Sequence, residues 1–117
     1  MKYHLKQVLN GKEEYYIKLI RHYDRNIGKS AALARLSAKY NIPIVVPTYS
    51  WKVLIEHDIP NKLSQYFRWN KPKAIILSKS NGLKYTNILV EEGLVDCEID
   101  KVKDIALKGI VGYRNYD

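Results

Sequence analysis

Cysteine is almost absent from this sequence, since Cys97 is the only one in 117 residues. A single thiol excludes an intrachain disulfide framework and a cysteine-rich zinc site. The three histidines, His4, His22 and His57, lack the spacing of metal ligands. We therefore expect no structural metal.

Long apolar runs are also absent. The best short runs, residues 42–46 and 74–77, have the length of strands and fall far short of the roughly 20 residues that cross a bilayer. The first six residues include charged side chains, and no apolar segment of signal-peptide length follows them. These absences predict an intracellular, cytoplasmic protein with no membrane segment.

The composition is that of a globular protein, with 46% hydrophobic and 27% charged residues, and the length predicts a single domain over residues 1–117. The formal net charge is +8, and it is unevenly distributed. Residues 1–40 carry nine basic and three acidic side chains, residues 41–80 six and two, and residues 81–117 five and seven. This distribution fits a surface that attracts nucleotide or nucleic-acid phosphates or an acidic protein, and it fits plain solubilising charge equally well.

The order of elements begins with a β-α-β pattern. Tyr15 to Ile20 is rich in aromatic and β-branched residues and predicts a strand. Residues 30–40 are strong helix formers with an apolar face at helical spacing, so they predict a helix that Asn41 and Pro43 end. Residues 42–46 then form a second predicted strand.

The second half continues the alternation. Ser50 is placed to cap a short helix that runs to about His57, and Pro60 is expected to break that helix. The remaining predicted elements are strands at 74–77 and 86–90 with a turn at 81–82 between them, a helix at 99–107, and a last strand at 110–113 beyond Gly109.

This alternation predicts the α/β class, with a small parallel sheet, helices on both of its faces, and three layers. Ligands of such sheets bind beyond the carboxyl ends of the strands. We therefore expect functional residues directly after the first strand and directly after the strand at 86–90.

A phosphate-binding motif lies between the first strand and the first helix. In Gly28-Lys29-Ser30, glycine lets backbone N–H groups approach phosphate, and a helix amino terminus favours negative charge. Lys29 would reach the β- and γ-phosphates, and the Ser30 hydroxyl would bind magnesium. The alternative without a binding function is a basic turn in which Ser30 caps a surface helix.

An acidic pair ends the strand at 86–90. Glu91 would hold magnesium, and Glu92 would orient or deprotonate the water that attacks the γ-phosphate. Two acids at a strand end are also common in solvated turns. Their order after the glycine, lysine and serine favours the catalytic interpretation.

Together these motifs resemble the phosphate-loop (P-loop) NTPases, and within them the phage terminase and helicase-like ATPases. Arg25-Asn26-Ile27-Gly28-Lys29-Ser30 looks like the loop variant Arg-x-x-Gly-Lys-Ser/Thr. The resemblance implies that loop residues 26–30 bind ATP and that Ser30 and Glu91 bind Mg²⁺. It also implies that Glu92 is the catalytic carboxylate and that the protein acts in the host cytoplasm if a phage encodes it. Within the loop, Arg25 is the candidate for stabilising transition-state charge.

The sequence departs from the family pattern at three points. Tyr23 stands where the first glycine of the loop belongs, Glu91 stands where aspartate is more frequent, and the chain is short for an ATPase core. We therefore expect a nucleotide-binding protein whose hydrolysis is slow or depends on a protein partner, nucleic acid or a homo-oligomer. The alternative is a non-catalytic basic module, such as a phage accessory or inhibitory protein, that contacts nucleic acid or another protein.

A mixed aromatic and basic segment lies between residues 51 and 73. Unpaired bases stack on aromatic rings while cations contact phosphates, so this composition suggests nucleic-acid binding. Aromatic side chains that pack on the sheet are the alternative. The candidate nucleic-acid residues are Lys62, Arg68, Trp69, Lys71 and Lys73.

Overall fold

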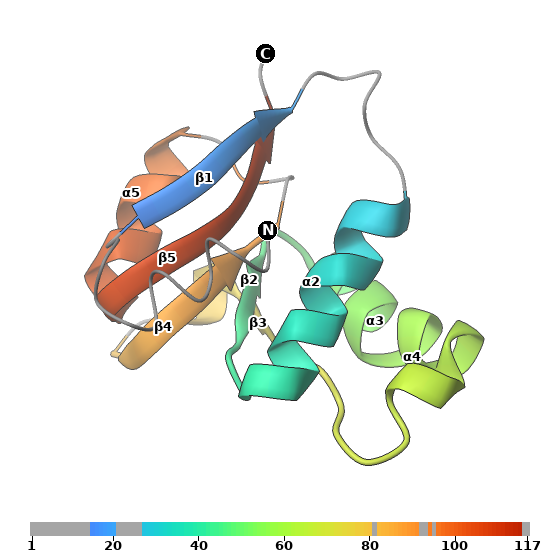
Figure 1. Cartoon of the computed structure of the whole chain (residues 1–117). Helices are drawn as coiled ribbons and strands as arrows, with labels where there is room; N and C mark the ends of the chain where they lie inside the picture. Colours follow the sequence, from blue (N-terminus) through green and yellow to red (C-terminus); the bar gives the residue numbers. More distant parts are fainter. Residues whose placement is uncertain (1–14, 21–26, 81, 92–93, 95, 116–117) are drawn as a thin grey trace.

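The computed structural model describes residues 15–20, 27–80, 82–91, 94 and 96–115 (Figure 1). Its strands are β1 (Tyr15–Ile20), β2 (Ile44–Val46), β3 (Ala74–Ile76), β4 (Tyr85–Val90) and β5 (Ala106–Asn115). Its α-helices are α2 (Ile27–Tyr40), α3 (Tyr49–Val53), α4 (Ile59–Lys62) and α5 (Asp96–Ile105). Shorter turns are the π-helical η2 (Leu54–Asp58) and the 3-10 turns η3 (Ser64–Tyr66) and η4 (Leu77–Lys79).

All strand pairs are parallel, and the sheet order is β1-β5-β4-β2-β3. Side chains alternate between two hydrophobic clusters. Ile44 and Val46 of β2 pack in the cluster of α2, η2 and α4, whereas Val45 packs in the cluster of α5. Because each strand residue points to the face opposite its neighbour, the two clusters are the two faces of one sheet. The predicted α/β class, with helices on both faces, is confirmed.

The carboxyl end of α2 follows the rules of helix capping. Asn41 has φ 55°, the left-handed conformation that asparagine tolerates better than most residues. The Ile42 N–H donates to the Ser37 carbonyl at 3.2 Å, and both Ile42 and Leu36 are buried in the α2 cluster. This is the Schellman arrangement with its apolar contact, and it explains why the helix ends where the sequence predicts.

The helical segment after β2 differs from the prediction. Thr48, not Ser50, caps α3, because the Thr48 hydroxyl accepts a hydrogen bond from the Trp51 N–H at 3.4 Å. Pro60 does not end the segment but lies in the first turn of α4, where a proline needs no intrahelical partner. The π-helical turn before it closes with the Ile59 N–H donating to the Leu54 carbonyl, so the helical path continues past the proline.

The last two elements also have different bounds. The final helix is α5 over Asp96–Ile105, and β5 runs without a break through Gly109, which was predicted to separate them. The β4–β5 register shifts between Tyr85 and Asn87, which pair with Ala106 and Gly109. Glycine is common next to such an irregularity inside a strand. Gly109 therefore belongs to the β4–β5 ladder and does not end it.

Helix α2 has 14 residues, which corresponds to roughly 21 Å at about 1.5 Å per residue. Along the part of the chain that the structure describes, no helix has the length and apolar character that a bilayer crossing requires.

Candidate nucleotide site and basic groove

The start of α2 lies at the carboxyl edge of the sheet. A helix that joins two parallel strands runs back against them, so its amino terminus lies where the strands end. Figure 1 shows the start of α2 toward the same end of the molecule as the arrowheads of β1 and β5. Ile27, Gly28 and Lys29 are the first residues of α2, and Ser30 in that first turn is only 3% exposed. The predicted residues Arg25 and Asn26 lie outside the described residues.

Glu91 follows the last residue of β4 and is fully buried. Its N–H donates to the Val45 carbonyl of β2 at 3.2 Å, and its carbonyl accepts from the Leu94 N–H at 3.5 Å. The backbone of this residue is therefore anchored to the neighbouring strand. Glu92, the predicted catalytic carboxylate, lies outside the described residues.

Alternation along β4 assigns Glu91 to the α2 side of the sheet. Ile88 and Val90 pack in the α5 cluster, whereas Leu89 packs with Leu33 in the α2 cluster. Glu91 comes two residues after Leu89 and is still bonded to β2, so its side chain continues the face of Leu89. Ser30 lies one turn before Leu33 on the same helix. Both side chains thus lie on one face of the sheet, toward its carboxyl edge.

The connections of the sheet place the end of β4 at a topological switch point. Strand β2 leads through α3 and α4 to its outer neighbour β3, whereas β4 leads through α5, on the other face, to β5. Ligands of open α/β sheets bind in the crevice where neighbouring connections diverge in this way. Glu91 stands at that divergence, because its N–H is bonded to the end of β2.

The possible metal ligands of Ser30 and Glu91 are oxygen atoms. A serine hydroxyl and one carboxylate match what Mg²⁺ takes from proteins, where one or two side chains complement phosphate oxygens and water. Among the described residues there is no group of three or more histidine, cysteine, aspartate or glutamate side chains that could hold a metal ion. Ser30 and Glu91 are the candidate ligands for a Mg²⁺ ion bound together with nucleotide phosphates.

A groove lies between α2 and the segment 65–70. Its volume is about 480 Å³. Two of the predicted nucleic-acid residues, Arg68 and Trp69, line it, together with the charged side chains of Arg35 and Lys39 from α2. Sequence reasoning did not predict the two α2 residues for this role, although their i, i+4 spacing puts them on one side of a helix.

The other predicted nucleic-acid residues do not line the groove. Lys62 ends α4 and Lys71 precedes β3, and both are exposed. The Lys73 ammonium lies 5.9 Å from the centre of the ring of Tyr85, the first residue of β4. Of the five predicted residues, Arg68 and Trp69 line the groove.

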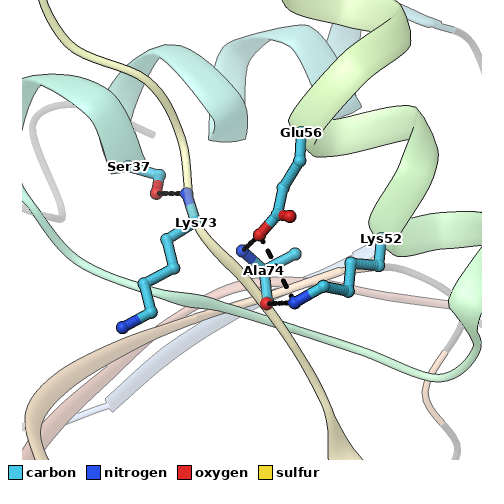
Figure 2. Close-up of polar contacts among 5 residues, drawn as sticks. All are labelled: Ser37, Lys52, Glu56, Lys73 and Ala74. Carbon is cyan, nitrogen blue, oxygen red and sulfur yellow. Dashed lines mark hydrogen bonds and ion pairs between the residues drawn. The ribbon is translucent and has the colours of Figure 1, made fainter.

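Lys52, another cation of this segment, has a structural contact instead. Figure 2 shows the outer edge of β3, where the Glu56 carboxylate accepts from the Ala74 N–H at 2.8 Å and the Lys52 ammonium donates to the Ala74 carbonyl at 2.9 Å. Lys52 and Glu56 also form an ion pair at 3.5 Å. On the neighbouring residue, the Lys73 N–H donates to the Ser37 hydroxyl at 3.1 Å. Lys52 and Glu56 thus occupy the backbone groups of Ala74 that β3, an edge strand, cannot pair with another strand.

Comparisons of the chain with protein-family models, with curated proteins and with solved structures gave no match.

Proposed function

We propose that the protein binds ATP with magnesium at the corner formed by the start of α2 and the end of β4. The observation that carries the proposal is that Ser30, in the first turn of α2, and Glu91, at the end of β4 beside the switch point of the sheet, are both buried. A helix amino terminus favours a phosphate there, and the carboxylate suits the cation that accompanies it.

Each residue has a distinct role in this proposal. The N–H groups of residues 26–30 and the Lys29 ammonium bind phosphate oxygens, and Ser30 and Glu91 hold Mg²⁺. Glu92 orients the attacking water, and Arg25 stabilises charge on the transferred phosphoryl group. Hydrolysis is slow without a partner, as in phosphate-loop enzymes whose site is completed by an arginine supplied in trans.

The test is thermal unfolding of the protein with and without millimolar ATP and magnesium. Ligand at about 100 times its dissociation constant adds about 2.7 kcal/mol of stability, which raises the Tm of a domain of this size by about 10 °C or more. Lys29→Ala is expected to lose most of this increase. Lys101→Ala, which removes an exposed lysine from α5, is expected to keep it. No increase in the wild type, or equal increases in both variants, would overturn the proposal.

A non-catalytic basic module is the second candidate, and the cations of the groove favour it. Phosphate release separates the two candidates. Release by the wild type that Glu92→Gln abolishes would support the ATPase, and binding without release, even with added nucleic acid and at high protein concentration, would support the module.

A further inference from the structure

We propose that the groove between α2 and segment 65–70 binds single-stranded nucleic acid, with an unpaired base stacked on Trp69. The inference concerns a second site and holds whether or not the chain binds ATP. Arg35 and Lys39 come five and nine residues after Ser30, roughly 8–14 Å further along the axis of α2. The groove is therefore separate from the corner proposed for the nucleotide.

Exposed aromatic rings are the first argument. Trp69 is 87% exposed and Tyr66 is 51% exposed, and both line the groove. Phe67 between them is buried in the α2 cluster, which anchors the segment to the core. Exposing the apolar ring of Trp69 to water is unfavourable, although the segment that carries it is anchored. The exposed ring offers a face on which any base can stack.

The charge of the groove is the second argument. Arg35, Lys39 and Arg68 are its charged residues, and none of the ten described residues that line it is acidic. The Arg35 guanidinium carbon lies 4.0 Å from the centre of the Tyr66 ring. This cation–π contact holds the guanidinium next to the ring, and guanidinium N–H groups bind phosphate oxygens well.

The shape of the site selects single strands. A volume of about 480 Å³ is in the range of pockets that accept a small organic ligand, which suits a base with its sugar. In a duplex the base faces are covered by their neighbours, so stacking on Trp69 requires an unpaired base. The apolar floor of Leu36 and Ala38 suits the ring of a base better than an acidic peptide.

The test is fluorescence anisotropy of labelled ten-nucleotide oligo-dT and oligo-U, with a DNA duplex as comparison. Both single strands are expected to bind, and the duplex more weakly. Trp69→Ala should weaken binding by about 5- to 150-fold, the usual effect of removing one stacked base contact, and Trp69→Phe should retain most of it. Three phosphate contacts predict that raising salt from about 50 to 200 mM weakens binding by about 20-fold. In Arg35→Ala this salt effect should be smaller.

Matched controls come from other surfaces of the chain. Tyr49→Ala removes a ring that is 68% exposed on α3, and Lys101→Ala removes an exposed lysine on α5. Neither residue lines the groove, so both variants should bind like the wild type. Equal losses in Tyr49→Ala and Trp69→Ala, duplex binding as tight as single-strand binding, or no binding to either single strand would overturn the proposal. Binding of an acidic peptide in place of the oligonucleotides would overturn it too.

Discussion

Gly112 of β5 shows how one residue limits the packing of the sheet. A Cβ built on Gly112 would lie 2.2 Å from the Val90 carbonyl oxygen and 2.7 Å from the Val90 nitrogen. Both are backbone atoms of the paired strand, so neither can move like the end of a flexible side chain. A side chain here forces β4 and β5 apart immediately before Glu91.

Gly112→Ala is therefore expected to destabilise the protein by about 1–3 kcal/mol, the usual cost of overpacking a core. Urea unfolding measures the effect. Gly82→Asn is the control, because Gly82 has φ +79°, which asparagine tolerates, and open space around its Cβ position. A Gly112→Ala variant as stable as the wild type would show that the strands can separate at little cost.

At the scale of elements, polar side chains of α3 and η2 join the helical segment to β3. Glu56 and Lys52 occupy the N–H and the carbonyl of one residue, Ala74. Side chains that cover an edge strand also keep that edge from pairing with another chain. The contact thus serves both stability and solubility.

Glu56→Ala should cost about 1–3 kcal/mol, because it leaves the partly buried Ala74 N–H without its acceptor. Glu56→Gln keeps an acceptor oxygen and should cost less. Chemical denaturation of both variants measures the difference. Asp58→Ala is the control, since Asp58 is exposed on the same segment and its side chain makes no cap hydrogen bond. If Asp58→Ala cost as much as Glu56→Ala, the hydrogen bond to β3 would not explain the loss.

The elements also show what sequence patterns can and cannot reveal. β1 and the carboxyl end of α2 were predicted well, because strand propensity and the cap at Asn41 are local signals. Pro60 and Gly109 were misread, since both residues usually interrupt regular structure. Here a π-helical turn and a register shift accommodate them, and both devices depend on tertiary packing that no local pattern encodes.

At the scale of the whole molecule, the two sites differ in how far the sequence revealed them. Ser30 and Glu91 could be placed at one edge of the sheet beforehand, because parallel strands always end on the same side. The groove could not be foreseen, since helical spacing puts Arg35 on a solvent face but does not say that segment 65–70 will pack beside it. The predicted set that included Lys62 and Lys73 followed nearness in sequence, whereas the groove depends on nearness in space.

The proposed function gives Glu91 and Glu92 different tasks at the end of β4, where the Glu91 N–H is bonded to the Val45 carbonyl of β2. Under the proposed function Glu91 holds the cation and Glu92 orients the attacking water. Glu91→Gln should therefore weaken magnesium-dependent ATP binding by at least about tenfold and leave magnesium-free binding unchanged. Glu92→Gln should retain binding and lose phosphate release.

Both variants are compared by ATP titration with and without magnesium and by phosphate release. Asp100→Asn, which removes an equal charge from an exposed position on α5, controls for the change in net charge. Equal losses of affinity and release in both variants would refute separate roles. Glu91 gives the sharper prediction of the two, because it is fully buried and, under the proposed function, its carboxylate acts on phosphate through Mg²⁺.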